Sequence, residues 1–305
     1  MRNLILFLIF LNLFFSCSEN KIENEEEQLN KSDIYIFNET TSKLANLNIE
    51  NGELTYVANF ISNGTTVGAI FNKENNEYIS FRNNVDPNFV RVNLTNGAVK
   101  YQVVTSNLVG NDVFSGLVID NDGEVYIFNE TAYKLAKLNI ENGELTYIAN
   151  FAIGGTNVGA VYHSQNNEYI SFENNVDPNF VRVNLTTGKV KYQIVTSNLV
   201  GNDFFSGLTI DNNGEVYIFN ETANKLAKLN IENGELTYIA NFAIGGTIVG
   251  AVYHSLNNEY ISFENNGDPN FVRVNLTNKE VNYQVITSNL VGNDIFSGIT
   301  INLEN

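Results

Sequence analysis

The chain repeats itself with a period of 91 residues, and this repeat is the strongest constraint on its fold. Tyr35, Tyr126 and Tyr217 begin the same phrase, YIFNET, at a constant spacing of 91 residues (126 − 35 and 217 − 126). Three copies placed end to end from Asp33 fill the chain to its last residue, Asn305. Such a chain is expected to build its core by packing near-identical units against one another.

Each copy contains short apolar runs separated by turn signals. Around Tyr126, Asp122-Gly123 and Asn142-Gly143 lie between such runs, and both pairs favour tight hairpins. The runs are rich in Val, Ile, Tyr and Phe and are too short for helices. We predict a four-stranded antiparallel meander with strands at 116–120, 124–129, 134–140 and 145–151. The stretch that starts at Asn167, NEYISFENN, weakly imitates this unit, so six meanders of two alternating types are expected.

The number and the phase of the meanders predict the fold class. Four-stranded units with a period in this range are typical of β-propellers. The first copy begins at Asp33, on the second strand of a unit, whereas the missing inner strand, Ser297–Asn302, lies at the end of the chain. Pairing of these two segments would close the ring and remove its exposed strand edges. We therefore predict an all-β, six-bladed propeller of three double-blade repeats, closed by the C-terminal strand.

One hairpin departs from the pattern of its copies. The third copy carries Asn278-Lys279 where the first carries Asn96-Gly97. A glycine at this position indicates a backbone with positive φ, which glycine adopts more readily than lysine. We expect Lys279 to weaken its hairpin slightly.

The first 17 residues have the pattern of a lipoprotein signal peptide. Arg2 is followed by an apolar stretch from Leu4 to Phe15, which is too short to span a bilayer and ends at Ser16-Cys17. A Cys directly after a small residue resembles a bacterial lipobox, which predicts lipid attachment at Cys17 and anchoring in the outer membrane. The alternative is an ordinary signal peptide in which this Cys is incidental. Because the chain has no second Cys, no intrachain disulfide is expected.

Residues 18–32 are polar and acidic without periodicity, which predicts a disordered tether before a propeller domain at 33–305. The cluster Glu25-Glu26-Glu27 resembles the acidic export tag that directs some bacterial lipoproteins to the cell surface. A solvated linker explains the same residues equally well, so surface exposure stays open.

The charge of the chain and its lack of common catalytic motifs argue against several classes of function. Seventeen basic and 34 acidic residues give a formal net charge of −17, which argues against a nucleic-acid partner. Walker, G-x-S-x-G and HExxH motifs are absent from the sequence, and no catalytic residue is predicted. His163 and His254 are interpreted as turn residues rather than as ligands of a channel metal. The run Asp120–Gly123 resembles part of a calcium loop but is better explained as a hairpin turn.

Two families of loops are predicted to lie on one face of the propeller, where such folds generally bind ligands near the channel. One family carries Gly-Asn-Asp just before an inner strand, and the other carries Asp-Pro-Asn between the second and third strands. The candidate ligand-binding residues are Asn111, Asp112, Asn202, Asp203, Asn293, Asp294, Asp86, Asp177 and Asp268.

Asp112, Asp203 and Asp294 are also the candidates for metal binding. Related by the repeat, they could hold a cation such as Ca²⁺ or bind sugar hydroxyls if they met at the channel mouth. The competing interpretation, which we favour, is that each is an ordinary turn residue that caps its own backbone.

The phrases SGLVIDNDGEVYIFN and SGLTIDNNGEVYIFN resemble the inner-strand, turn and second-strand pattern of NHL, SMP-30 and YVTN-type propellers. The resemblance covers the propeller domain and implies its fold. Some members are lactonases that hold a divalent metal in the channel through one Glu and a few Asn or Asp. That asymmetric set cannot be placed here, because every candidate occurs three times.

Two function classes therefore remain. The first is a non-enzymatic, monomeric surface lipoprotein that binds a protein or glycan partner across one propeller face. The second is a metal-dependent hydrolase or lactonase of the SMP-30 kind. The threefold internal identity favours binding, because catalysis usually needs groups in different roles.

Overall fold

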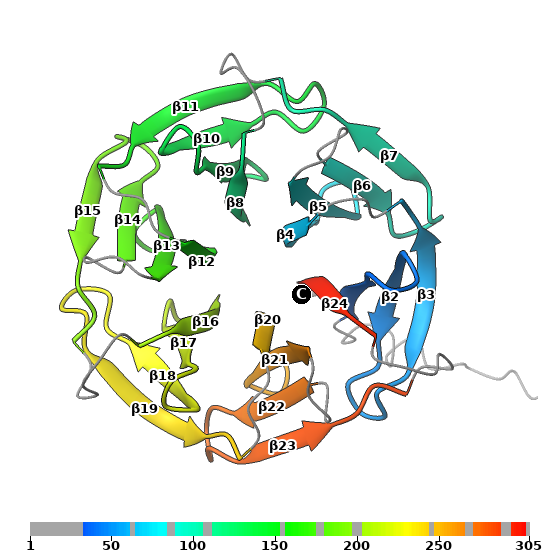
Figure 1. Ribbon diagram of the computed structural model, residues 1–305, viewed down its shortest axis with the longest axis vertical. Coiled ribbons are helices and arrows are strands. Elements are labelled where there is room, and N and C mark those ends of the chain that lie inside the picture. The colour runs from blue at the N-terminus through cyan, green and yellow to red at the C-terminus, as the bar shows by residue number, and fades with distance from the viewer. Residues whose placement is uncertain are drawn as a thin grey trace, which may run out of the picture.

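A computed structural model describes the chain at residues 33–61, 65–83, 89–105, 112–152, 156–174, 180–196, 203–243, 247–265, 271–287 and 294–302. Within these ranges, six four-stranded antiparallel sheets stand as blades around a central axis (Figure 1). Blades are numbered along the chain from 1 to 6. The predicted all-β, six-bladed propeller is confirmed.

The odd-numbered blades carry the YIFN phrase on their second strand. From the axis outwards, their strands are β24 (Phe296–Asn302), β1 (Asp33–Asn38), β2 (Lys43–Leu47) and β3 (Leu54–Asn59) in blade 1, β8 (Phe114–Ile119), β9 (Val125–Asn129), β10 (Lys134–Leu138) and β11 (Leu145–Asn150) in blade 3, and β16 (Phe205–Ile210), β17 (Val216–Asn220), β18 (Lys225–Leu229) and β19 (Leu236–Asn241) in blade 5. The four strands predicted for blade 3 agree with β8 to β11 to within two residues at each end.

The even-numbered blades carry the EYISF phrase on their second strand. From the axis outwards, their strands are β4 (Thr65–Asn72), β5 (Glu77–Asn83), β6 (Phe89–Asn93) and β7 (Val99–Gln102) in blade 2, β12 (Thr156–His163), β13 (Glu168–Asn174), β14 (Phe180–Asn184) and β15 (Val190–Gln193) in blade 4, and β20 (Thr247–His254), β21 (Glu259–Asn265), β22 (Phe271–Asn275) and β23 (Val281–Gln284) in blade 6.

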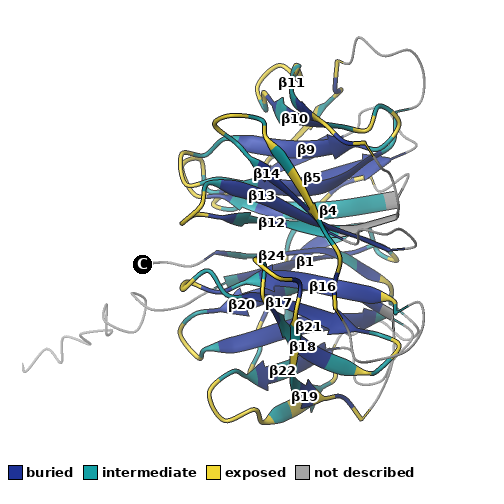
Figure 2. Cartoon of the chain, turned by 90° about the vertical axis from the view of Figure 1, so that its left-hand side faces the viewer, coloured by how far each residue is buried: buried dark blue, intermediate teal, exposed yellow. Residues whose placement is uncertain are grey.

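The core lies between the blades rather than at the centre of the ring. Each of six buried clusters joins residues of two neighbouring blades. Between blades 4 and 5, for example, the ring of Phe172 stacks on Phe180 and packs at a tilt against Phe205. Strands such as β13 are buried along their whole length, because both faces of the sheet meet a neighbour. Exposed residues gather instead on the turns (Figure 2).

A bulge in the inner strand of each odd blade brings neighbouring blades close together. In β8 the pairing with β9 shifts between Ser115 and Val118, around Gly116 at φ 59°. The hydroxyl of Tyr169, from blade 4, donates a hydrogen bond of 3.0 Å to the carbonyl of Gly116. A Cβ at this glycine would lie 2.1 Å from that hydroxyl oxygen, so only glycine permits the approach.

The predicted closure of the ring is also confirmed. β24 pairs antiparallel with β1, from Asp33 opposite Asn302 to Asn38 opposite Phe296. Arg273 of blade 6 donates a hydrogen bond of 3.0 Å to the carbonyl of Ile49 in blade 1. Arg91 and Arg182 make the same contact to Ile140 and Ile231 across the internal junctions, so the closing junction is built like the others.

The backbone of Lys279 has the positive φ that the sequence comparison indicates. Its φ is 65°, close to 70° at Gly97 and 68° at Gly188. Lysine therefore occupies a left-handed conformation in which the other two copies use glycine.

The signal peptide, Cys17 and the tether lie outside the described residues. The part of the chain that the structure describes contains no helix long and apolar enough to cross a bilayer.

Candidate functional site

The six inner strands run in the same direction and enclose a channel along the axis. Residues near their N-terminal ends line a cavity of about 610 Å³, which we call the wide end. Residues nearer their C-terminal ends line a second cavity of about 270 Å³, which we call the narrow end. The waist, which borders both cavities, consists of Ala69, Leu117, Ala160, Leu208, Ala251 and Ile299.

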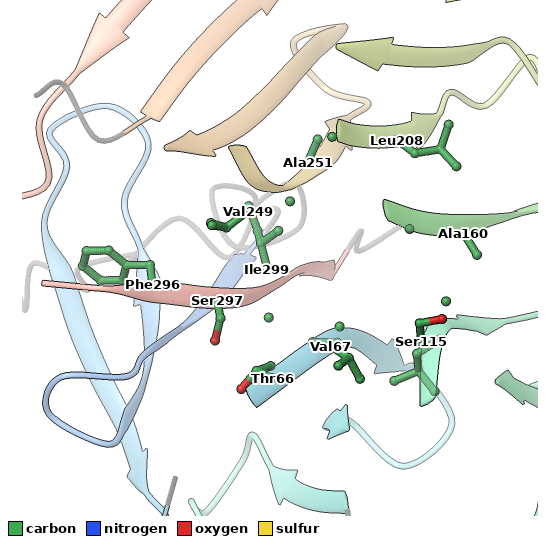
Figure 3. Close-up of a pocket in the computed structure, with 18 of the residues that line it drawn as sticks. Thr66, Val67, Ser115, Ala160, Leu208, Val249, Ala251, Phe296, Ser297 and Ile299 are labelled. Atoms are coloured by element: carbon green, nitrogen blue, oxygen red, sulfur yellow. The ribbon is translucent and has the colours of Figure 1, made fainter. Parts of the chain in front are cut away.

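The wall of the wide end combines apolar side chains with polar groups in about equal measure. Val67 and Val249 contribute aliphatic side chains to the wall (Figure 3), and Gly68, Gly159 and Gly250 also line the cavity. A concave site of this size, which combines apolar side chains with polar groups, could hold a ligand.

The polar groups of the wide end include amides that hold neighbouring blades together. The Asn83 side chain donates to the carbonyl of Phe114 and accepts from its backbone N–H, both at 2.8 Å. Asn174 and Asn265 make the same paired contacts to Phe205 and Phe296. The hydrogen-bonding groups of these amides are therefore already paired with backbone groups of the neighbouring blade.

In the first repeat, a carboxylate at the wide end has partners within the protein. The hydroxyl of Ser297 donates a hydrogen bond to Glu39. The buried guanidinium of Arg82 donates to the carbonyl of Ile61. Burial lowers the pKa of Arg82, while the charge of Glu39 acts in the opposite direction. Burial raises the pKa of Tyr78 far above its usual range, with a further increase from Glu39 and a decrease from Arg82. The Tyr78 hydroxyl itself donates a hydrogen bond of 2.9 Å to the carbonyl of Gly298.

The other two repeats reverse the charge at the position of Arg82. Glu173 and Glu264 occupy it, with 0% and 1% of their surface exposed. Burial raises the pKa of Tyr260, and the carboxylates of Glu264 and Glu221 raise it further. An acid–base combination in the first repeat is therefore replaced by two acids in the third.

The serine beside these groups also differs between repeats. Ser115, which lines the wide end, is only 7% exposed, and its hydroxyl makes no hydrogen bond within the described part of the chain. Its counterpart Ser297 donates to Glu39. The second repeat thus leaves a buried hydroxyl beside the cavity with unused hydrogen-bonding capacity.

The structure places the three candidate aspartates in their own blades. Oδ2 of Asp112, Asp203 and Asp294 accepts a hydrogen bond of 3.1–3.2 Å from an Asn amide at the end of the second strand of the same blade, namely Asn129, Asn220 and Asn38. Within the described residues, no three His, Cys, Asp or Glu side chains form a group that could hold a metal ion. The three aspartates are therefore not brought together as metal ligands. The other candidates, Asn111, Asn202, Asn293, Asp86, Asp177 and Asp268, lie outside the described residues.

His163 and His254, which were interpreted as turn residues, end strands β12 and β20, and their side chains cap the turns that follow. Nδ1 of His163 and of His254 accepts a 3.3 Å hydrogen bond from a backbone N–H three residues later. Burial lowers the pKa of His254. Oδ1 of Asp120 accepts from the N–H groups of Asp122 and Glu124, which caps the hairpin.

Exposed apolar side chains stand beside the entrance of the wide end. Phe204 and Ile295 are 48% and 51% exposed, and each directly follows one of the candidate aspartates. Ile295 also lines the cavity. Ile295 therefore connects the wall of the cavity to the outer surface.

Sequence reasoning missed the acidic and hydroxyl groups of the wide end. Glu39 and Glu130 line it, yet within YIFNET they look like parts of an ordinary strand end. The differences between the copies could have indicated them. Position 82 and its counterparts change from Arg to Glu, and position 113 and its counterparts change from Val to Phe and Ile. Both sets of residues belong to the same end of the channel.

Comparison with known proteins identifies relatives by fold alone. No family model matches the sequence, and no curated protein matches it. Among solved structures, a chain of a nidogen/laminin complex has a TM-score of 0.66 at 12% identity, covering 90% of this chain and 99% of that chain.

Two further similar structures are bacterial. Virginiamycin B lyase from Staphylococcus aureus has a TM-score of 0.60 at 13% identity, covering 84% of this chain and 81% of that one. Regucalcin from Agrobacterium tumefaciens, described as a calcium-binding protein, has a TM-score of 0.53 at 14% identity, covering 72% and 74%. These neighbours support the predicted likeness to SMP-30-type propellers at the level of the fold. At such identities they carry no activity to this chain.

Proposed function

We propose that this protein is a membrane-anchored, non-enzymatic binding module that holds a protein partner over the wide end of its channel. The observation that carries the proposal is the cavity of about 610 Å³, whose lining includes the exposed side chain of Ile295. Burial of such surface against a partner is favourable, and contiguous exposed apolar surface often marks an interaction site. The exposed side chains of Phe204 and Ile295 suit a protein surface better than a polyhydroxylated glycan.

In this proposal, the N-terminal segment determines where the module acts. A lipid on Cys17 would hold the chain at the outer membrane, and the acidic residues 18–32 would act as the tether. The candidate residues Asp112, Asp203 and Asp294 precede the inner strands at the wide end. They would contribute polar contacts around the apolar centre, as is usual at protein interfaces.

The metal-dependent hydrolase has less support. The described residues contain no group of three metal-ligating side chains from which a mechanism could be derived.

Blocking the waist of the channel tests the proposal. Ala160→Phe combined with Ala251→Phe would place two aromatic rings where the wide and narrow ends meet. We expect the wild-type chain to bind the neutral apolar dye Nile red with one dye per chain, and the double variant to bind it at least about tenfold more weakly, because the apolar cavity is filled. Fluorescence titration measures both affinities.

Leu256→Ala is the matched control, because it removes an exposed apolar side chain that does not line either cavity. It should leave dye binding unchanged. Thermal melting checks that all variants are folded, and the single variant Ala160→Leu provides a milder block. Equal dye affinity in wild type and in a folded, blocked variant would contradict the proposal.

A further inference from the structure

We propose that Tyr133, Phe204 and Ile295 make the wide end an asymmetric docking face for one protein partner, which presents an apolar segment flanked by Lys or Arg. This inference rests on the proposed function and names the partner chemistry and the recognition residues of the same face. It depends on positions at which the three repeats differ from one another.

The turn after the second strand of each odd blade holds a different side chain in every copy. Ser42, Tyr133 and Asn224 occupy one position, and their backbones share a left-handed conformation with φ of 53–58°. This conformation is strained for a bulky side chain, whereas Asn tolerates it. The Tyr133 side chain is 49% exposed and forms no hydrogen bond, ion pair or ring contact with any described residue. The fold does not require this ring, which favours a contact outside the chain.

The residue before each odd inner strand shows the same kind of difference. The backbone N–H groups of Val113, Phe204 and Ile295 each donate a hydrogen bond of 2.9–3.0 Å to a Thr hydroxyl in the neighbouring turn. The backbone is thus held alike in all copies, while the side chain changes. Phe204 and Ile295 are exposed, and Ile295 also lines the cavity. The fold does not need an exposed Phe or Ile at a position where another copy carries Val.

The three odd blades alternate with the even blades around the ring (Figure 1). At its wide end, each odd blade carries a different exposed apolar side chain: Ile295 in blade 1, Tyr133 in blade 3 and Phe204 in blade 5. Large apolar and aromatic side chains carry much of the binding energy at protein interfaces. A partner that matches this set fits in a single rotation about the axis, because the repeat of the ring does not extend to these side chains.

The charge of the wide end selects the flanks of the partner segment. Glu39 and Glu130 line the cavity, and among the described residues that line it there is no Lys, Arg or His. The whole chain carries a formal net charge of −17. A basic segment is therefore attracted, whereas a second copy of the chain is repelled by the same charge.

The test titrates fluorescein-labelled model peptides with the full chain. The first peptide combines Leu and Lys in the order of an amphipathic helix, the second replaces its Lys by Glu, and the third replaces its Leu by Gln. Fluorescence anisotropy measures the affinities. We expect one Leu/Lys peptide to bind per chain, at least about tenfold more tightly than either of the others, because the second lacks the charge and the third lacks the apolar side chains.

Substitutions that copy the residue of another repeat identify the recognition side chains without new demands on the backbone. Tyr133→Ser introduces the residue found at Ser42, and Phe204→Val introduces the residue found at Val113. Each should weaken binding of the Leu/Lys peptide at least about fivefold, as is typical of a central interface aromatic.

The matched control lies at the narrow end. Leu256, in the turn after β20, is as exposed as Tyr133, and Leu256→Gln copies Gln165 of the preceding repeat, so the affinity should not change. A double variant tests the asymmetry: Tyr133→Asn with Asn224→Tyr moves the tyrosine from blade 3 to blade 5 without altering the composition. It should weaken the peptide as much as Tyr133→Ser does.

The outcomes separate this inference from the proposed function. Equal affinity for the Leu/Lys and Leu/Glu peptides, unchanged binding in folded Tyr133→Ser and Phe204→Val, full binding by the double variant, or no peptide binding at all would overturn it. A wild-type dimer that both single variants disrupt would assign the face to a second copy and also overturn it. Tyr133 and Phe204 do not line the cavity, so Nile red binding would persist in these cases and keep the binding module. Failure of every peptide and of Nile red would overturn both.

Discussion

At the scale of single residues, equivalent positions of the three repeats can be compared with one another. Arg82, Glu173 and Glu264 occupy the same position on the same kind of strand, and all three are buried. Burial of a charged group is costly unless neighbouring groups pair with it or form hydrogen bonds to it. A reversal of charge at such a position therefore requires different neighbouring groups. The difference between copies is therefore more informative here than their identity.

Lys279 offers a residue-scale prediction for stability. Lys279→Gly should raise the free energy of unfolding by about 1 kcal/mol, because the left-handed conformation at φ 65° costs a non-glycine residue about this much. The reverse change, Gly188→Lys, should cost more, since a Cβ there would lie 2.3 Å from the carbonyl oxygen of Ile148. Urea unfolding measures both changes.

The control for this prediction is Lys100→Ala, which removes an exposed lysine from β7 without altering a left-handed backbone. Its effect should stay within about 0.5 kcal/mol. A loss of stability in Lys279→Gly would show that the lysine side chain contributes a contact that outweighs the backbone cost.

At the scale of elements, neighbouring blades are joined by side chains that bind backbone. Asn174 of β13 makes two hydrogen bonds to Phe205 of β16, at 2.9 and 3.0 Å. Arg182 of β14 is paired with Glu168 at 2.7 Å and also donates to Ile231 in the next blade. These contacts set the spacing of the inner strands and thereby the width of the channel.

Asn174→Leu should destabilise the protein by about 2–4 kcal/mol, because it leaves a buried N–H and a buried C=O of Phe205 unpaired. Asn166→Leu, at an exposed turn position, serves as the control and should change stability little. Similar unfolding free energies for the two variants would show that the paired contact does not hold the blades together.

At the scale of the whole molecule, stability depends on closure of the ring. β24 supplies the inner strand of blade 1, and its side chains Phe296 and Ile299 belong to the cluster between blades 6 and 1. Without β24, one edge of β1 would lose its hydrogen-bonding partner and become available for aggregation.

Deletion of residues 296–305 should therefore abolish the cooperative thermal transition or cause aggregation, since removal of a single buried Phe already costs about 3–5 kcal/mol. Deletion of 303–305 alone keeps β24 and should melt like the full chain. Differential scanning calorimetry and size-exclusion chromatography compare the two. A 296–305 deletion that melts at the same temperature as the full chain would contradict closure by β24.

The strands, their turns and the closure of the ring could be predicted from the sequence alone. These features depend on local patterns, such as Asx-Gly hairpins at Asn142-Gly143, and on the 91-residue period that begins in the middle of a blade. The positive φ of Lys279 could likewise be read from the glycines of its copies.

The site was decided by the tertiary structure. The sequence pointed to Asp112, Asp203 and Asp294, but each of these carboxylates is held by an Asn of its own blade, a contact that depends on how the second strand ends beside the first. The wall of the wide end combines Glu130 and Ser115 of one blade with residues of the others, such as Val249. Side chains from six blades meet only because the inner strands converge on one axis. The spacing of residues along the chain does not show which side chains this convergence brings together.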